Sequence, residues 1–179
     1  METAYHSPLN PVLETEPGRR LPCGRLYGAA FGLVISAAAR RHPGLLLVVT
    51  ADTPSATRLE EELRFFTGGD PELPVLHFPD WETLPYDIFS PHQDIVSDRL
   101  QTLYRLPGLT RGILVVPVST LMHRLAPREY IEGSALMLDV GDTLDLDTMR
   151  RRLERAGYNC VSQVMEHGEF AVRGSLLDL

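Results

Sequence analysis

Hydrophobic and polar residues follow two rhythms along this chain, and these rhythms predict its secondary structure. Apolar residues that recur at spacings of three and four predict helices, and short continuous apolar runs predict buried strands. Pairs such as Pro43–Gly44 and Pro107–Gly108 mark where helices end. Up to residue 132, the pattern predicts helices at 29–41, 53–66, 93–106 and 119–125, and strands at 45–50, 75–78 and 113–118.

Strands and helices therefore alternate three times, which is typical of βαβ units. The run from Leu45 to Thr50 is continuously apolar and rich in branched residues, so we expect a strand buried on both faces. The predicted fold class is α/β, with a parallel sheet and helices on both of its faces.

The pattern of apolar residues and turns changes at two places along the chain, which predicts three structural parts. Residues 1–20 show no hydrophobic periodicity. They are expected to form an irregular arm, with one short helical turn at 12–16. Residues 21–132 form the α/β domain, and residues 133–179 begin a small α+β module. In that module the pattern predicts strands at 135–140 and 160–165, a helix at 145–156, and strands within 170–179. Because the last residues are an apolar strand, we expect the module to be truncated and the chain to be a fragment.

Composition and charge narrow the class of protein. Apolar residues make up 44% of the 179 residues and the net charge is −7, so a dedicated nucleic-acid binder is disfavoured. The longest apolar run is far shorter than the roughly 20 residues of a membrane helix. There is no visible secretory signal, and Cys23 and Cys160 do not make a disulfide scaffold. These features predict a cytoplasmic protein.

Many α/β folds bind nucleotides through a glycine-containing phosphate-binding loop. In this sequence, only residues 28–35 place glycines directly before a predicted helix. If Gly28 is the first glycine of G-x-x-x-x-G-K-[ST], then Leu33, Val34 and Ile35 occupy the last three positions. The groups that bind phosphate and Mg²⁺ are missing, and Asp52 is interpreted as a helix cap. The histidines and cysteines are scattered without metal-ligand spacing. We therefore predict no catalytic, cofactor or metal site in this segment.

The loop from Asp80 to His92 is the most distinctive segment of the sequence. The stretch 78–92 that includes it contains three prolines, at 79, 85 and 91, and the loop carries the aromatic residues Trp81, Tyr86 and Phe89. These aromatics form either a binding surface or a cover over the open edge of the core. The sequence favours neither interpretation.

Two sets of arginines stand out in the second module. Four lie on the helix at 145–156 and are expected to face outward, either as a solvated face paired with Asp147 and Glu154 or as a partner-binding patch: Arg150, Arg151, Arg152 and Arg155. Arg173 is isolated in an apolar strand beside Gly174, which is typical of an interaction anchor. The competing interpretation of Arg173 is an internal ion pair with Glu166 or Glu169.

Four motifs carry a resemblance to a known family. They are D-W-E-T-L-P-Y-D at 80–87, F-S-P-H-Q-D at 89–94, Q-V-M-E-H-G-E at 163–169 and R-G-S-L-L-D-L at 173–179. Together they resemble the bacterial transcription-repair coupling factor family, over essentially all of the chain after about residue 20.

This resemblance implies the N-terminal region of that family, which is similar to the B subunit of the nucleotide excision nuclease. The implied fold is a degenerate helicase-like domain without a phosphate loop, followed by an inserted module that binds the A subunit of the nuclease. The family's arginine in R-G-x-L-L-D-L contributes to that binding, and here it is Arg173.

The family's function implies a division of labour between this segment and the parent protein. The parent uses ATP and Mg²⁺ in its motor domains to translocate on double-stranded DNA, displaces stalled RNA polymerase and recruits repair. The segment itself is expected to be an adaptor without enzymatic activity, which is also compatible with restraining the motor. The rival hypothesis is a stand-alone α/β nucleotide-dependent enzyme.

Overall fold

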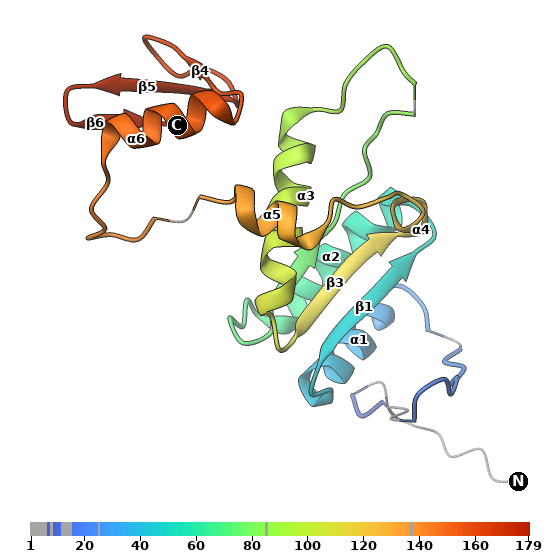
Figure 1. The fold of residues 1–179 in the computed structure, drawn as a ribbon. Helices are drawn as coiled ribbons and strands as arrows, with labels where there is room; N and C mark the ends of the chain where they lie inside the picture. The colour runs from blue at the N-terminus through green and yellow to red at the C-terminus, as the bar shows by residue number, and fades with distance from the viewer. Residues whose placement is uncertain (1–6, 8, 12–15, 25, 85, 137) are drawn as a thin grey trace, which may run out of the picture. The chain divides into compact units, whose positions relative to one another are not determined.

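The chain folds into two compact units, and each is described by itself (Figure 1). The computed structural model describes residues 7, 9–11, 16–24, 26–84, 86–136 and 138–179. Unit 1 spans residues 1–126 and unit 2 spans residues 127–179. The helical turn predicted at 12–16 falls on residues 12–15, which lie outside the described residues.

A parallel three-stranded sheet forms the centre of unit 1. Its strands are β1 (Leu45–Thr50), β2 (Val75–His77) and β3 (Gly112–Pro117), in the order β1-β3-β2. β3 pairs with β1 along its whole length and with β2 through three residues. Every residue of β3 is buried, as expected for a central strand that is covered on both faces.

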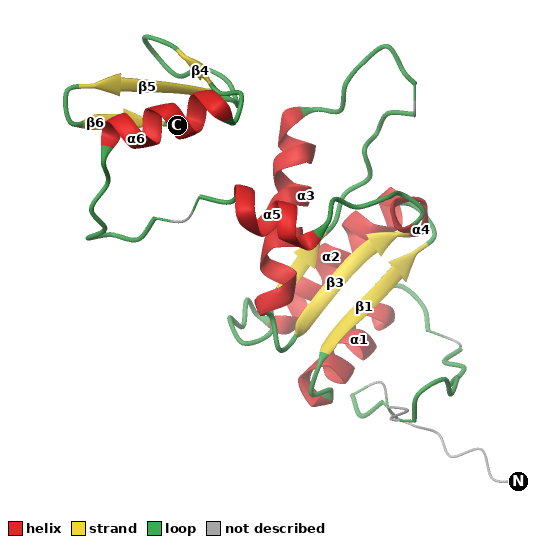
Figure 2. Ribbon diagram, viewed as in Figure 1, coloured by secondary structure: helices red, strands yellow, loops and turns green. Residues whose placement is uncertain are grey.

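Helices cover both faces of this sheet (Figure 2). On one face lie α1 (Ala30–Arg41) and α2 (Thr53–Thr67), and on the other lie α3 (Gln93–Arg105) and the short 3-10 helix η1 (Leu106–Gly108). Alternate residues of β3 serve the two faces: Ile113 and Val115 pack with α1 and α2, while Leu114 and Val116 pack with α3 and η1. A four-residue helix, α4 (Val118–Leu121), follows β3. The predicted α/β class is confirmed.

The prediction that the first strand is buried on both faces is wrong. β1 lies at the edge of the sheet, and Leu47 and Val49 are 54% and 48% exposed. Leu46 and Val48 face the α1–α2 cluster, so the two exposed residues point to the opposite face. An apolar run looks the same in an edge strand and in a central strand, because the difference depends on which other segments pack beside it.

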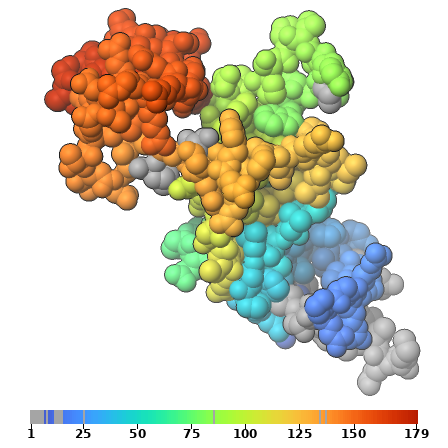
Figure 3. Space-filling model, in the orientation of Figure 1, coloured from blue at the N-terminus to red at the C-terminus, as the bar shows by residue number. Residues whose placement is uncertain are grey.

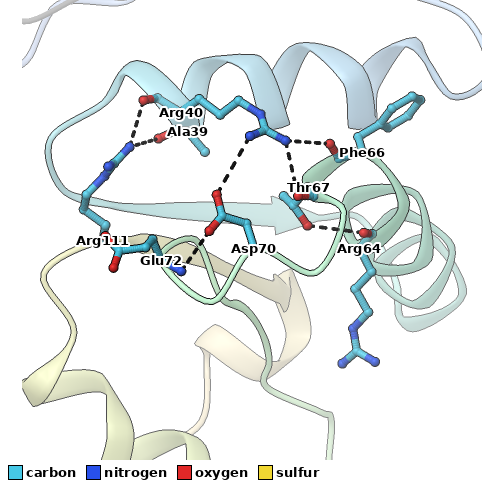
Figure 4. A network of polar contacts seen from close by, with 8 residues as sticks. All are labelled: Ala39, Arg40, Arg64, Phe66, Thr67, Asp70, Glu72 and Arg111. Carbon is cyan, nitrogen blue, oxygen red and sulfur yellow. Dashed lines mark hydrogen bonds and ion pairs between the residues drawn. The ribbon is translucent and has the colours of Figure 1, made fainter.

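Two arginines join the helix ends of unit 1 (Figure 4). Arg40 donates to the carbonyls of Phe66 (2.9 Å) and Thr67 (3.3 Å) at the end of α2, and its guanidinium lies 3.9 Å from Asp70. Arg111 donates to two carbonyls at the end of α1, at 2.8 and 3.3 Å. The last carbonyls of a helix lack partners within the helix and carry partial negative charge, so these contacts stabilise both helix ends.

Unit 2 is a small α+β fold with one hydrophobic cluster. Its elements are α5 (Arg128–Ser134), α6 (Leu146–Arg155), β4 (Asn159–Cys160), β5 (Glu169–Arg173) and β6 (Leu176–Asp178). β5 lies between β4, to which it is parallel, and β6, to which it is antiparallel. Met149 and Leu153 of α6 pack against Phe170, which is fully buried.

Two strands predicted for unit 2 are wrong. The described residues within 135–140 are not in a strand, and Val140 is fully exposed. Of the strand predicted at 160–165, only Cys160 takes part in β4. The backbone N–H groups of Met165 and Glu166 donate to the carboxylate of Glu169 at 2.9 and 3.2 Å, which turns the chain instead. The domain boundary predicted at 132/133 falls within α5, whereas unit 2 begins at Pro127; the predicted domain limits remain predictions.

Candidate protein-binding site

Arg173 lies at the end of β5, directly before the turn of a hairpin. The turn residues are Gly174 and Ser175, and Arg173 is paired with Leu176 of β6. Gly174 has φ +62°, a left-handed conformation that glycine adopts without strain and that suits a two-residue hairpin turn. Val172 belongs to the hydrophobic cluster, so Arg173 points to the opposite face of the sheet, where its side chain is 56% exposed.

An acidic neighbour on β6 holds Arg173 loosely. The Arg173 guanidinium lies 3.5 Å from the carboxylate of Asp178, and both side chains are about half exposed. Ion pairs of this kind contribute about 0–1 kcal/mol to stability. The internal ion pair considered from the sequence is therefore present, but with Asp178 rather than with Glu166 or Glu169. Asp178 orients the guanidinium and leaves part of it accessible to a partner.

Leu176 is a site residue that the sequence interpretation did not single out. It is 54% exposed and lies directly across from Arg173 on the same face of the hairpin. The outer end of the hairpin thus combines a guanidinium with an apolar side chain. If a two-residue turn at Gly174 is assumed, the R-G-x-L spacing places Leu176 opposite Arg173. The pairing could therefore have been predicted from the sequence.

The arginines of α6 face outward, as the sequence predicts. Arg150 donates to Glu154 at 2.9 Å, which raises the pKa of the arginine, and Arg152 donates to the carbonyl of Ala135 at 3.0 Å. All four side chains are exposed. Because α6 covers the inner face of the sheet and Arg173 lies on the outer face, the α6 arginines and Arg173 belong to separate surfaces.

In unit 1 the loop at 80–92 has a packed base and an exposed far part. The guanidinium of Arg99, from α3, lies 4.2 Å from the ring centroid of Phe78 and 4.0 Å from that of Trp81. Arg99 is only 2% exposed and also donates to the carbonyl of Pro79. Tyr86 and Phe89 are highly exposed. Trp81 covers the buried Arg99, as the interpretation of a cover over the core expects, whereas Tyr86 and Phe89 do not, and the binding-surface interpretation stays a prediction.

Arg99 is the buried residue that the sequence interpretation missed. The apolar spacing along residues 93–106 would place Leu100 on the inner stripe of this helix, yet Leu100 is 44% exposed. Arg99 takes the inward place, four residues after Ile95 and four before Leu103. Burial lowers the pKa of Arg99, and the carboxylate of Asp80 acts in the opposite direction. The spacing was visible in the sequence, but an arginine on an apolar stripe gives no sign of the aromatic rings that cover it.

The two glycines at 28–35 have different roles: Gly28 has φ +54° in the turn before α1, and Gly32 serves helix packing. Gly32 is buried in α1 at the crossing with α2, where an added Cβ atom would lie 2.8 Å from Cβ of Glu62 and 3.3 Å from the ring of Phe66. Leu33, Val34 and Ile35 continue the helix. The glycine turn at Gly28 therefore leads into a packed helix, and the absence of a nucleotide site stays a prediction.

Other classes of site have little support among the described residues. Within them, no three His, Cys, Asp or Glu side chains gather closely enough to hold a metal ion. The same residues include no helix with the length and apolar character to cross a membrane. Cys23 and Cys160 are free and exposed.

Comparison with known proteins points to one family. Residues 136–179 match the family described as "UvrB interaction domain". The chain is 47% identical over 168 residues to the transcription-repair-coupling factor of Escherichia coli K12, covering 94% of this chain and 14% of that protein. It is 47% identical over 179 residues to that of Haemophilus influenzae, covering 100% of this chain and 15% of that protein.

A more distant relative agrees. The transcription-repair-coupling factor of Myxococcus xanthus is 38% identical over 175 residues, which cover 94% of this chain and 14% of that protein. The chain thus spans about one seventh of the length of the curated relatives it matches. The resemblance carried by the four sequence motifs is confirmed, and the chain belongs to the transcription-repair-coupling factor family.

Proposed function

We propose that this chain is the repair-docking segment of a transcription-repair-coupling factor. In this proposal, unit 2 binds the A subunit of the nucleotide excision nuclease through the outer face of its hairpin. One observation carries the proposal: the match to the UvrB interaction domain covers the part of unit 2 that presents Arg173 beside an exposed leucine.

The parent protein supplies the activities that this segment lacks. We propose that it is a cytoplasmic ATP-driven translocase on double-stranded DNA that displaces RNA polymerase stalled at lesions. ATP, Mg²⁺, polymerase and DNA would then be bound by parts of the parent outside this chain. Unit 1 and unit 2 would recruit repair proteins, and the segment is also compatible with restraining the motor until it is needed.

The docking chemistry follows from the exposed guanidinium. Arginine presents several N–H donors in a planar fork that fits carboxylates and backbone carbonyls. The Asp178 carboxylate lies 3.5 Å from the guanidinium, so an acceptor on a partner would share or replace this weak ion pair. The partner surface best suited to the hairpin is therefore an acceptor group, such as a carboxylate, beside an apolar depression for Leu176.

The docking test uses the full-length protein and the purified A subunit. Arg173→Ala is expected to weaken binding about 30-fold, corresponding to roughly 2 kcal/mol for an interface anchor. The matched control is Arg128→Ala, which removes an exposed arginine from the same unit that also pairs with a carboxylate, Glu132, at 2.6 Å. Affinity unchanged by Arg173→Ala, or reduced equally by Arg128→Ala, contradicts the docking role.

The rival function, a stand-alone nucleotide-dependent enzyme, is tested separately. We expect the 179-residue chain not to bind a fluorescent ATP analogue in the presence of Mg²⁺, because Leu33, Val34 and Ile35 stand where lysine and a hydroxyl are required. Saturable binding at micromolar concentration would support the enzyme instead.

A further inference from the structure

The far part of the loop in unit 1 carries an unusual concentration of exposed apolar side chains. Between residues 84 and 89, four large side chains are at least 71% exposed: Leu84, Tyr86, Ile88 and Phe89. Single exposed apolar residues are common, but a contiguous group on one short segment marks an interaction site. We call residues 82–84 and 86–92 the apolar loop. In Figure 3 the green part of the chain projects from the rest of unit 1.

The residues that lead into the apolar loop are anchored by two sets of contacts. Arg99 is enclosed between the rings of Phe78 and Trp81 and donates to the carbonyl of Pro79. At the same end of the loop, the hydroxyl of Ser119 donates to the carboxylate of Asp80 at 2.5 Å. These contacts fix where the loop leaves the core. A loop that is fixed at its base loses less conformational freedom on binding than a free one.

The negative charge around the apolar loop indicates which kind of partner it would bind. Residues 65–98 contain seven Asp or Glu and neither Arg nor Lys. Glu82 and Asp87 of the loop, and Asp94 just after it, are exposed. This local negative charge repels the phosphates of nucleic acids and of anionic membranes. A protein surface with an apolar pocket bordered by basic side chains fits instead.

From this we infer that the apolar loop inserts into such a basic-rimmed apolar pocket elsewhere in the same polypeptide. The inference rests on the proposed function only in taking this chain as part of a longer protein. The chain spans 14–15% of its relatives, so under the proposed function most of the polypeptide would lie outside it. A pocket on the same polypeptide meets the loop at an effective concentration that reaches the millimolar range, well above that of a separate protein.

The test is photo-cross-linking within the full-length protein. Phe89→p-benzoylphenylalanine places the probe on the apolar loop, and Phe65→p-benzoylphenylalanine is the control. Phe65 is also an aromatic residue of unit 1, and it is 79% exposed on α2. We expect position 89 to give about five-fold more intramolecular cross-links than position 65, to a single segment outside residues 1–179. The double substitution Leu84→Ser and Ile88→Ser should abolish that excess.

Two results overturn the inference. One is an equal cross-link yield from positions 89 and 65. The other is cross-linking from position 89 only after the A subunit or RNA polymerase is added, which identifies an external partner. The result is independent of docking by unit 2, because Arg173→Ala leaves the apolar loop intact. Loss of A-subunit binding and loss of the intramolecular cross-link are thus separate outcomes.

Discussion

The two units use arginine in opposite ways. All 17 basic side chains of the chain, histidine aside, are arginines. In unit 1, Arg99 is buried between two aromatic rings, while Arg40 and Arg111 bind the carbonyl ends of helices. In unit 2, the arginines of α6 and Arg173 are exposed. These three guanidinium groups hold elements of unit 1 together, whereas in unit 2 Arg152 reaches the Ala135 carbonyl but all five of these arginine side chains stay exposed.

The two units also differ in the size of their hydrophobic cores. Unit 1 has a hydrophobic cluster on each face of its sheet, whereas unit 2 has one cluster with three buried residues. A small domain with a small core is marginally stable, because it buries a smaller share of its surface. Unit 2 should therefore be the unit that a single core substitution unfolds.

The largest expected effect is that of Phe170→Ala. Phe170 is fully buried at the centre of the cluster in unit 2, so its truncation should cost about 3–5 kcal/mol. We expect loss of hydrogen-exchange protection in α6 and β5. Trp81, the single tryptophan, lies in unit 1, and its fluorescence should keep its wild-type urea midpoint. A parallel shift of that midpoint would show that the two cores unfold together.

Arg99→Ala should have the next largest effect, and on unit 1. The substitution removes two cation–π contacts and a charged hydrogen bond from a buried site, which together amount to roughly 3 kcal/mol. Urea unfolding followed by Trp81 fluorescence measures the loss. Arg105→Ala, at an exposed position on the same helix, is the control and should change stability by less than about 0.5 kcal/mol. Equal effects of the two substitutions would mean that Arg99 contributes no more than a surface arginine.

The same glycine-to-alanine change should have opposite signs in the two units. In α1, Gly32→Ala forces a Cβ atom to within 2.8 Å of Glu62, so we expect a net loss of about 1 kcal/mol despite the better helix propensity of alanine. In α5, nothing lies within 4 Å of a Cβ atom at Gly133, so Gly133→Ala should stabilise by up to about 1 kcal/mol. Thermal unfolding of both variants measures this difference. A higher melting temperature for Gly32→Ala than for the wild type would contradict the prediction.

The smallest expected effect is a pH dependence that the two units share. Asp52 caps α2 and Asp145 caps α6, and hydrogen bonds from Ser55 and Thr148 lower the pKa of the respective carboxylates. A carboxylate with a lowered pKa in the folded state stabilises above its unfolded pKa of about 4, and this contribution disappears as pH falls further. Asp52→Asn keeps a capping acceptor but does not titrate. It should flatten the acid-induced decrease of the Trp81 urea midpoint, whereas Asp145→Asn should not.

Much of unit 1 was predictable because local rules decide it. The periodicity around Val34 and Ile35 and the stop at Pro43 predict α1 within one residue of its observed bounds, and the apolar run predicts β1 at Leu45–Thr50. The polar residue after β1, Asp52, caps α2 as interpreted from the sequence. Unit 2 was harder, because its strands are short and the run after Cys160 is redirected by the Glu169 carboxylate.

Some features of the candidate site were likewise predictable from the sequence, and others depended on the tertiary structure. The sequence by itself determined the family and singled out Arg173 beside Gly174, because both depend on a local motif. Only the tertiary structure decided that Asp178 is the partner of Arg173, that Arg99 is buried and that one face of β1 is uncovered. Each of these depends on which distant segment packs alongside. An arginine is buried only where aromatic rings and a carbonyl converge on it, and that convergence is a property of the assembled fold.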